Sequence, residues 1–320
     1  MSNFANSQVI IEKKMKKLLY LLIATLVMAA CGQSYEEKRK LSRQERLRLM
    51  RQDSAALKIA VMPTLDCLPL FVARHHQLFE AAGADIRLKQ FTAQMDCDTA
   101  IAGGSVEGCV TDLVRAERLK KQGTPLRYMT RTDAYWQLFS NRMARIKELR
   151  QLDDKMVGAT RFSATDMLTS MAVDSCKMKT ENVYRIQVND VHIRLKMLMA
   201  DEVDAAWLTE PQATEARLAR HRLMTDSRGL KVQLGAIAFR EVIFADSTRQ
   251  KQIEVFKKAY NQACDSLKRY GTGRYRDVII TYCKMKPEQA DSLPKDLQFH
   301  HITAPADDDI KRAQEWLNKQ

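Results

Sequence analysis

The sequence predicts an α/β fold built on mainly parallel sheets, and three features of the 320-residue chain support this. Short apolar runs such as residues 57–62 (LKIAVM) are typical of strands that are buried on both faces of a parallel sheet. Longer segments with apolar residues at helical spacing alternate with these runs. Hydrophobic residues make up 45% of the chain, which is enough for the cores of two domains.

The first half of the predicted fold begins with the strand at residues 57–62, which ends at Pro63. Pro69 suits the first turn of a helix over residues 68–79, and Gly83 suits its C-terminal cap. Further strands are expected at residues 86–91, 108–111, 126–130 and 136–140, and further helices at 96–104 and 113–121.

A second set of alternating elements begins at residue 155. Strands are expected at residues 155–160, 184–188, 204–208 and 231–239, and helices at 167–176, 192–200 and 212–220. The remainder is expected to be helical at residues 248–270, 275–283 and 307–318. Such an alternation gathers loops and helix N-termini at the carboxyl ends of the strands, where ligands bind.

The N-terminus resembles a bacterial export signal. Four lysines between positions 13 and 17 precede an apolar run over residues 18–30. This run is shorter than the ~20 apolar residues that cross a bilayer, so residues 1–30 are expected to be a signal peptide, with 1–14 as an upstream extension if Met15 is the start. The segment MAAC resembles a lipobox and predicts that Cys31 is acylated. A plain signal peptide or a membrane stub is the alternative.

The net charge of +13 is concentrated near the N-terminus. Residues 32–55 alone carry seven Lys/Arg against four Asp/Glu and have no regular apolar face. Residues 31–56 are therefore expected to form a lipidated, charged and partly helical tether beside an anionic membrane. Because no aromatic residues interleave with this charge, no nucleic-acid partner is expected.

Six cysteines remain if Cys31 carries a lipid. They can pair in many ways, and none stands in a CxxC or other metal-binding spacing. An exported protein can form disulfides, and buried free thiols are the alternative. Neither a metal, a cofactor nor a cysteine nucleophile is expected. The six cysteines that remain besides Cys31 are Cys67, Cys97, Cys109, Cys176, Cys264 and Cys283.

Four segments resemble the solute-binding lipoproteins of ABC importers for nitrate, sulfonates and thiamine precursors, a periplasmic-binding-protein type 2-like family. In chain order they are LKIAVMPTLDCLPLFVARHHQLFE, AIAGGSVEGCVTDL, LKMLMADEVDAAWLTEPQATEA and IKRAQEWL. The third is the most similar, with a helix, an acidic turn, a strand and a Glu-Pro dipeptide. The chain departs from the family pattern at Glu107, where Asp is usual, and at Asp201 and Glu202, which replace a turn that contains glycine.

The resemblance implies two α/β lobes that close on a ligand about a hinge. Residues 57–132 and 238–320 would form the first lobe, and residues 133–237 the second. The chain would cross between the lobes near residues 131–135 and 235–239. The family further implies a binding protein without enzymatic activity, which delivers a small molecule to a permease in the inner membrane.

The candidate ligand contacts lie at the carboxyl ends of the predicted strands. Arg161 would pair with a carboxylate or sulfonate, together with the helix start at residues 163–165. Asp66, Asp112 and Glu210 would instead accept hydrogen bonds from an amine or aminopyrimidine, and three nearby carboxylates favour this ligand over an inorganic anion. The full set is Thr64, Leu65, Asp66, Thr111, Asp112, Arg161, Phe162, Ser163, Ala164, Thr165, Asn189 and Glu210.

Several of these residues also have simpler explanations. Asp112 stands at an expected helix N-cap, and capping alone accounts for such a residue. Arg161 would pair with a nearby aspartate, and Glu210 would stabilise the start of a helix. Trp136 and Trp207 are expected in the core rather than stacked on a ligand.

No catalytic motif stands out in the sequence: there is no glycine-rich phosphate loop, no HExxH and no GxSxG.

The favoured function is an exported envelope lipoprotein, facing the periplasm, that captures a small organic solute. One alternative is an enzyme on the same fold that acts on a pyrimidine or quinone precursor, because fold does not dictate function. The other is a sensory lipoprotein without an importer.

Overall fold

The computed structural model describes residues 43–320. The predicted signal peptide and Cys31 lie outside the described residues, as does most of the predicted tether. The described residues divide into two separate compact units, and the division falls between residues 55 and 56. Within the first unit, Arg43–Ala55 form helix α2. The sheets, the helices that cover them and the site all belong to residues 56–320.

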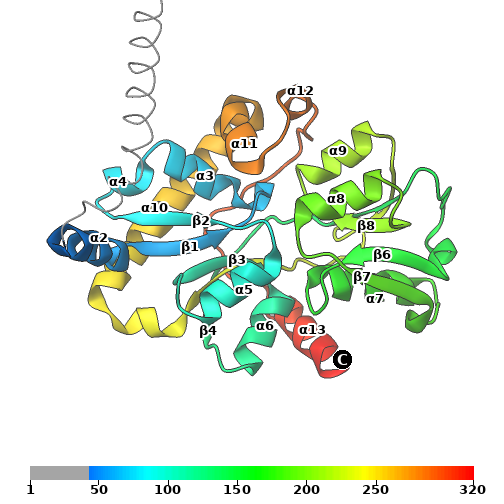
Figure 1. Ribbon diagram of the computed structural model, residues 1–320, viewed down its shortest axis with the longest axis horizontal. Coiled ribbons are helices and arrows are strands. Elements are labelled where there is room, and N and C mark those ends of the chain that lie inside the picture. Colours follow the sequence, from blue (N-terminus) through cyan, green and yellow to red (C-terminus); the bar gives the residue numbers. More distant parts are fainter. Residues whose placement is uncertain (1–42) are drawn as a thin grey trace, which may run out of the picture. The chain divides into compact units, whose positions relative to one another are not determined.

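Five strands form the first sheet, in the order β2-β1-β3-β10-β4 (Figure 1). Strands β1, β2 and β3 pair in parallel, whereas β10 pairs antiparallel with both β3 and β4. One strand therefore runs against the other four, which confirms the predicted, mainly parallel fold. The bounds are β1 (Leu57–Val61), β2 (Ile86–Gln90), β3 (Gly108–Asp112), β4 (Leu126–Arg131) and β10 (Gly235–Arg240).

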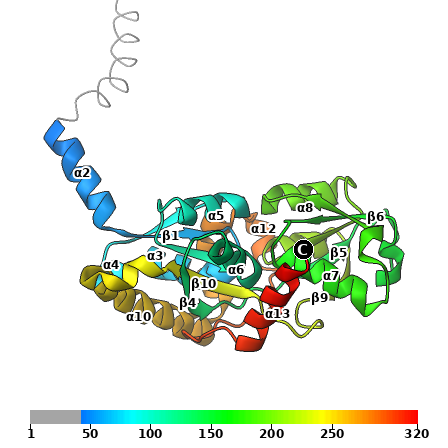
Figure 2. The same ribbon diagram turned by 90° about the horizontal axis from the view of Figure 1, so that it is seen from below.

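Helices cover both faces of this sheet (Figure 2). The helix predicted over residues 68–79 is broken, because Gln77 has a φ of 55° in the left-handed region, where a helix cannot continue. The sheet and its helices, which we call the first lobe, enclose one apolar cluster. The helical segments are η1 (Leu65–Cys67), α3 (Leu68–His75), α4 (Leu78–Ala81), α5 (Gln94–Ala102), α6 (Leu113–Lys121), η4 (Glu241–Ala245), α10 (Ser247–Tyr270), η5 (Thr272–Tyr275), α11 (Arg276–Cys283) and α12 (Pro287–Ala290).

The second sheet, with its helices, forms the second lobe. Its strand order is β7-β6-β8-β5-β9, and β5 runs against the other four strands. The sequence analysis missed β9, because its residues RLMTD are only partly buried and contain no continuous apolar run. The elements are β5 (Gln137–Ser140), η2 (Leu149–Leu152), β6 (Lys155–Ala159), α7 (Ala164–Ser175), η3 (Thr180–Asn182), β7 (Val183–Gln187), α8 (Val191–Met199), β8 (Ala205–Leu208), α9 (Gln212–Leu218) and β9 (Arg222–Asp226).

The second sheet is apolar on both faces, and alternate residues of its strands enter different clusters. In β5, Leu138 packs with α7 whereas Phe139 packs with α8 and α9. In β8, Trp207 and Leu208 divide in the same way. This follows from the two-residue period of a strand, which points successive side chains to opposite faces. A short strand without polar positions can therefore be buried completely.

Two segments carry the chain between the sheets. Residues 132–136 lead from β4 to β5, and residues 227–234 lead back from β9 to β10. The return crossing was predicted near residues 235–239, and the connecting segment directly precedes them, because residues 235–240 already form β10 within the first sheet. The first residue of β10, Gly235, lies close to the outgoing segment. A side chain would not fit there, because a Cβ would lie 2.2 Å from Thr132 Oγ1.

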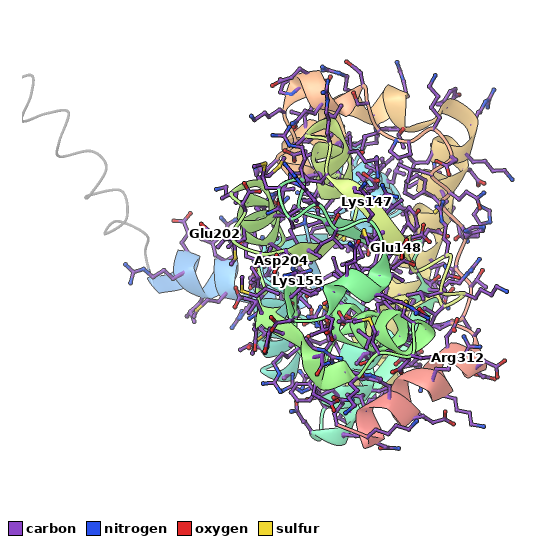
Figure 3. All side chains as sticks on the ribbon, turned by 90° about the vertical axis from the view of Figure 1, so that its right-hand side faces the viewer. Lys147, Glu148, Lys155, Glu202, Asp204 and Arg312 are labelled. Atoms are coloured by element: carbon purple, nitrogen blue, oxygen red, sulfur yellow. The ribbon has the colours of Figure 1, made fainter. Side chains whose placement is uncertain are left out.

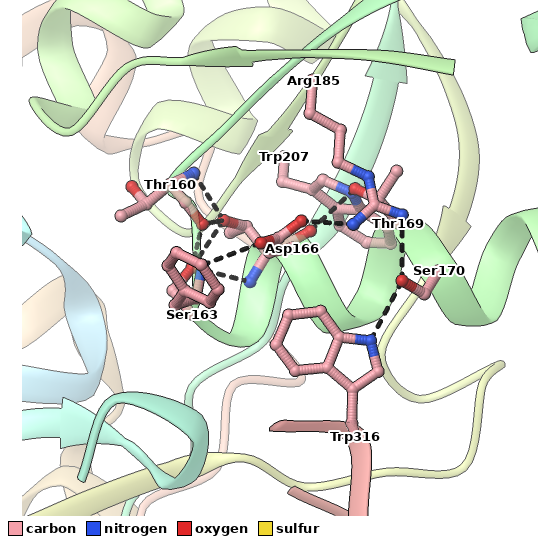
Figure 4. A network of polar contacts seen from close by, with 10 residues as sticks. Thr160, Ser163, Asp166, Thr169, Ser170, Arg185, Trp207 and Trp316 are labelled. Atoms are coloured by element: carbon pink, nitrogen blue, oxygen red, sulfur yellow. Dashed lines mark hydrogen bonds and ion pairs between the residues drawn. The ribbon is translucent and has the colours of Figure 1, made fainter. Parts of the chain in front are cut away.

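Helix α13 (Asp307–Asn318) adds a third connection between the lobes. Gln314 donates a hydrogen bond of 2.8 Å to Glu117 of α6 in the first lobe. Two residues further along the helix, on its other side, the indole N–H of Trp316 donates a hydrogen bond of 3.0 Å to Ser170 of α7 in the second lobe (Figure 4). Arg185 also donates to Ser170, at 2.9 Å. The C-terminal helix was predicted as part of the first lobe, but it packs on both.

The outer end of the second lobe carries charged side chains (Figure 3). Lys147, Glu148 and Glu202 are exposed there. Asp204 accepts a hydrogen bond of 2.8 Å from the backbone N–H of Met156 and so stabilises the edge of the sheet. This end of the second lobe is a solvated surface.

Candidate functional site

A small cavity lies where the carboxyl ends of strands from both sheets meet. Its volume is about 40 Å³. A water molecule needs roughly 10–15 Å³ by this kind of measure, so the cavity holds only a few small groups in the arrangement seen here. We call it the interlobe cavity. Its lining is Met62, Thr64, Asp66, Gln94, Val110, Thr111, Asp112, Arg115, Ala134, Trp136, Val191, Arg194, Trp207, Leu208, Thr209 and Gln212.

Direct hydrogen bonds between the lobes explain the small volume. On one side, the N–H of Leu65 donates to the carbonyl of Glu210 at 2.8 Å, and Gln212 Nε2 donates to the carbonyl of Pro63 at 3.0 Å. On the other side, the N–H of Val191 donates to the carbonyl of Thr92 at 3.1 Å. The structure therefore shows the two lobes closed on each other.

Three buried atoms of the cavity residues make no hydrogen bond to any residue that the structure describes. They are Thr111 Oγ1, Asp112 Oδ2 and Gln212 Oε1. Buried polar atoms are almost always hydrogen-bonded, and leaving one without a partner costs about 1–3 kcal/mol. All three can accept a hydrogen bond. The residues of the cavity therefore offer three unsatisfied acceptors to a group that carries N–H or O–H donors.

Asp112 is the charged member of this group. Its Oδ1 atom accepts hydrogen bonds of 3.0 Å from the N–H of Arg115, which caps α6, and of 3.0 Å from the N–H of Ala164 in the second lobe. Burial raises the pKa of Asp112 to about 6, because desolvation disfavours the carboxylate. The carboxyl group of Asp112 therefore changes its protonation state close to neutral pH.

Two buried arginines line the same cavity but are already occupied. Arg115 forms an ion pair of 2.5 Å with Asp98, and it also donates to the carbonyl of Gln94. Burial alone would lower the pKa of Arg115, but the carboxylates of Asp98 and Asp112 raise it above its usual value. The guanidinium of Arg115 is therefore an internal counter-ion of the first lobe.

Arg194 donates to neutral oxygens instead. Its partners include the carbonyls of Val188 and Trp207, at 3.0 and 3.1 Å, and the hydroxyl of Thr160 at 2.6 Å. Burial lowers the pKa of Arg194 to about 10. These bonds fix the carboxyl ends of three strands of the second sheet, β6, β7 and β8, so Arg194 stabilises the wall of the cavity.

Four of the twelve predicted contacts line the interlobe cavity: Thr64, Asp66, Thr111 and Asp112. Leu65 and Glu210 line a smaller adjoining cavity, which also includes Asp66. Asn189 lies nearby, where its amide contacts the sulfur of Met95 at 3.1 Å. The predicted strand ends are thus brought together, but only part of the predicted set faces one space.

The structure does not place Arg161 in the cavity. Its side chain is exposed, its guanidinium lies 5.4 Å from the ring centroid of Phe162, and both residues line a separate surface depression. Arg161 lies in the loop before α7, next to Phe162, which has a left-handed φ of 52°. The predicted anion anchor is therefore absent from the cavity as the structure describes it.

The predicted helix start at residues 163–165 is buried and satisfied internally. Ser163 Oγ accepts from the N–H of Thr165 at 3.2 Å and donates to the carbonyl of Thr160 at 2.7 Å (Figure 4). The N–H of Ala164 is bonded to Asp112. These groups join the lobes and shape the loop, and they are not available to an anion in this closed arrangement.

Glu210 stabilises the start of a helix, as the alternative explanation predicted. Its carboxylate accepts hydrogen bonds from Thr214 at 2.7 Å and Gln137 at 3.0 Å, and forms an ion pair of 2.5 Å with Arg217. Capping is also observed for Asp112, whose Oδ2 atom nevertheless makes no hydrogen bond to a described residue.

Sequence reasoning missed Gln94, Arg115, Arg194 and Gln212. Arg115 follows the cap of α6 by three residues, and Arg194 follows the cap of α8, Asp190, by four. Residues at these spacings lie on the same side of a helix as its cap, so an arginine there faces the strand ends. Trp136 and Trp207 are buried in the core, as expected, and their edges also line the cavity.

The described residues contain no cluster of His, Cys, Asp and Glu side chains that could hold a metal ion. Among the same residues, no helix combines the length and the apolar character that crossing a bilayer requires.

Several solved structures share this fold. The alkanesulfonate-binding protein of Xanthomonas axonopodis pv. citri, bound to MOPS, is 17% identical with a TM-score of 0.69, over 83% of this chain and 92% of that one. The periplasmic aliphatic sulphonate-binding protein of Escherichia coli is 17% identical with a TM-score of 0.66, over 82% and 87%. The periplasmic nitrate-binding protein of Synechocystis PCC 6803 is 13% identical with a TM-score of 0.64, over 73% and 68%.

At these identities the likeness establishes the two-lobed fold of periplasmic binding proteins, which confirms the predicted architecture. No curated protein sequence is similar enough to this chain to count as a relative. The sequence profile described as NMT1/THI5-like, however, matches residues 64–295. This match spans most of both lobes and includes the strand ends that form the interlobe cavity. The chain therefore belongs to the NMT1/THI5-like family.

Proposed function

We propose that this protein is the exported, lipid-anchored solute-binding component of an ABC importer, and that it captures a small organic solute with amine or aminopyrimidine character. Family membership and the two-lobed fold support a binding protein. The observation that carries the ligand class is the set of three unpartnered acceptors, Thr111 Oγ1, Asp112 Oδ2 and Gln212 Oε1, in one buried cavity.

The charges around the cavity favour an N–H donor over an anion. The positive charge of Arg115 is neutralised by Asp98, the guanidinium of Arg194 is bound by oxygens of the second lobe, and Arg161 lies elsewhere. An anion would meet the carboxylates of Asp66 and Asp112, which repel it. An amine or an amino-heterocycle would instead give Asp112 the partner that its free oxygen lacks.

Capture requires the lobes to part. Ligand pockets usually have volumes of roughly 300–1,000 Å³, far more than the interlobe cavity offers here. An open form would admit the solute, and closure would restore contacts such as the one between Asp112 and Ala164. The ligand shifts this equilibrium only by its preference for the closed form, which a permease would then recognise.

Export and anchoring rest on residues outside the described part of the chain. The basic region, the apolar run over residues 18–30 and the MAAC segment favour a signal peptide and a lipid on Cys31. Cys31→Ser is expected to release the protein from the membrane fraction and to abolish labelling by a radioactive fatty acid. A membrane-bound, unlabelled variant would contradict the anchor while leaving the binding function in place.

The ligand class is tested by thermal unfolding of residues 43–320 with aminopyrimidines, thiamine, polyamines, amino acids, sulfonates and nitrate. A ligand at 100 times its Kd stabilises by about 2.7 kcal/mol, which raises Tm by roughly 5–10 °C in a domain of this size. Amines or amino-heterocycles are expected to give this shift. A shift by sulfonates or nitrate alone would overturn the ligand class, and a flat panel from folded, ligand-free protein would overturn the binding function.

Two matched variants locate the site. Asp112→Asn keeps the shape of the cavity residue but removes the carboxylate, so the thermal shift is expected to shrink or disappear. Arg161→Ala removes a positive charge that lies outside the interlobe cavity, so the thermal shift is expected to persist. Loss of the shift in Arg161→Ala but not in Asp112→Asn would place the ligand elsewhere.

A further inference from the structure

A second, larger depression lies where the connections between the lobes come together. Its volume is about 550 Å³, within the range of roughly 300–1,000 Å³ that is usual for ligand pockets. Its lining comes from residues 131–135, from residues 227–233 of the return segment, from residues 296–300 and from the first turn of α13. Of the residues that line the interlobe cavity, only Ala134 also lines this space, which we call the hinge depression.

Gln233 joins three walls of the hinge depression. Its Oε1 atom accepts a hydrogen bond from Arg131 Nη1, and its Nε2 atom donates one of 3.2 Å to the carbonyl of Thr132. Its backbone N–H donates one of 3.3 Å to Asp309 of α13. The end of β4, the two crossing segments and α13 are thus bonded through one residue, so the groups around the depression are held in a defined arrangement.

The carboxylates that line the hinge depression already have partners. In each case the partner is an N–H group or a cation close by, so the negative charges are offset within the protein. The pairs are Asp133 with the backbone N–H of His300 at 2.8 Å, Asp296 with Arg228 at 3.2 Å, and Asp309 with Arg312 at 3.8 Å.

Two cations of the hinge depression have no such counter-ion. The half-buried guanidinium of Arg131 donates to Gln233 but forms no ion pair with any residue that the structure describes. Its Nε–H is buried and has no hydrogen-bond partner among the same residues. The exposed ammonium group of Lys231 likewise forms no ion pair or hydrogen bond within residues 43–320. The depression therefore holds uncompensated positive charge and unused N–H donors.

We propose that the hinge depression binds a small oxyanion, such as phosphate, sulfate or a carboxylate, between Arg131 and Lys231. A guanidinium can hold two oxygens of such an ion side by side, and an ammonium group adds a second charge-assisted hydrogen bond. The ion would give the buried Nε–H of Arg131 the acceptor that it lacks, which removes the cost of an unsatisfied donor. This site is separate from the interlobe cavity, and it does not depend on which solute binds there.

The ion would connect the segments about which the lobes move. Arg131 ends β4 in the first lobe, whereas Lys231 belongs to the return segment. Hinge motion changes the backbone torsions of such segments, so it changes the distance between the two cations. The closed arrangement places both cations around one depression. The ion is therefore expected to favour the closed form and, by reciprocity, to raise the affinity for a solute that binds this form.

Binding is tested by titration calorimetry of the full chain in detergent with inorganic phosphate, sulfate and succinate. Chloride keeps the ionic strength constant, because screening alone weakens any attraction between charges. At least one of the three oxyanions is expected to bind, with a single ion per chain. A protein that binds none of them would overturn the proposal.

Two variants and a matched control locate the ion. Lys231→Gln removes the ammonium group from an exposed side chain, so Kd is expected to rise about tenfold, the effect of losing one hydrogen bond to a charged group. Arg131→Gln should abolish binding, because it removes the guanidinium. Lys258→Gln removes an exposed lysine of α10 outside the depression and should leave Kd unchanged. Equal weakening by Lys231→Gln and Lys258→Gln would show unspecific attraction to a basic surface and would overturn the site.

Hydrogen exchange tests the link to closure. The backbone N–H groups of Leu65, Ala164 and Val191 donate across the lobes, so they exchange when the lobes part. Their exchange is expected to slow when the binding oxyanion is added to wild type, and to slow much less in Lys231→Gln at the same concentration. Unchanged exchange at these groups, with the ion bound, would overturn the coupling between the hinge depression and closure.

Discussion

The carboxylate of Asp112 accepts a hydrogen bond of 3.0 Å from the backbone N–H of Ala164, and this bond joins the two lobes. The same oxygen caps α6 through the N–H of Arg115, while the other oxygen has no partner among the described residues. A ligand that bonds to the free oxygen would add to the contact that closes the lobes and would not compete with it. Asp112 therefore links helix capping, lobe closure and ligand recognition.

Protein stability is expected to depend on the titration of Asp112. Burial raises its pKa from 3.8 to about 6, so between these values the folded protein holds a proton that the unfolded chain releases. The contribution of Asp112 to the free energy of unfolding is greatest below about pH 4. It falls by about 3 kcal/mol as the pH rises to about 6. Urea unfolding of wild type and Asp112→Asn from pH 4 to pH 8 measures this loss.

The asparagine keeps an oxygen for the N–H groups of Arg115 and Ala164, so the variant should differ from wild type mainly in this pH window. Its free energy of unfolding is expected to lack the decline between about pH 4 and pH 6 that burial of the Asp112 charge produces. Parallel curves for the two proteins over the whole range would show that the carboxyl group titrates normally.

Ligand affinity is expected to fall when Asp112 is protonated. An N–H donor bonds to the carboxylate, and at about one pH unit below the pKa only about a tenth of the protein carries it, so Kd should rise about tenfold per unit below pH 6. Titration calorimetry of a ligand from the thermal screen, at pH 5 and pH 7, measures the ratio. An unchanged Kd in wild type would exclude Asp112 as the acceptor.

The alternation of strands and helices could be predicted from the sequence, because the spacing of the apolar residues differs between strands and helices. Continuous apolar runs such as residues 57–62 became central strands, and Pro69 entered the first turn of α3. The strand β9 was missed because an edge strand that is half exposed needs no such run. The break at Gln77 was missed because no glycine or proline marks it.

The site was predicted in outline and not in detail. Loops at strand ends were expected to converge, and Thr64, Asp66, Thr111 and Asp112 do so. The exposure of Arg161 depends on the conformation of the loop before α7, which the sequence does not reveal. Arg194 could have been expected from its spacing after a helix cap, but its partners come from distant strands.

The ion pair between Glu210 and Arg217 is expected to stabilise the protein without contributing to ligand binding. Glu210 is buried and satisfied by Gln137, Thr214 and Arg217. Glu210→Gln should cost about 1.5–3 kcal/mol in the free energy of unfolding, the range for a hydrogen bond to a charged group. The same thermal screen should return the same ligand class. If the variant had normal stability but no longer bound the ligand, Glu210 would be a ligand contact.

The hydrogen bond between Trp316 and Ser170 is expected to hold α13 on the second lobe. Trp316→Phe keeps most of the apolar contact but removes the N–H, and Ser170→Ala removes the acceptor while Arg185 keeps other partners. A double-mutant cycle by urea unfolding should give a coupling of about 1 kcal/mol. Trp316→Ala should cost about 3–5 kcal/mol, because it also leaves a cavity where α6, α7 and α13 meet. A coupling near zero, with a small cost for Trp316→Ala, would mean that α13 does not fasten the lobes and that the two crossing segments alone connect them.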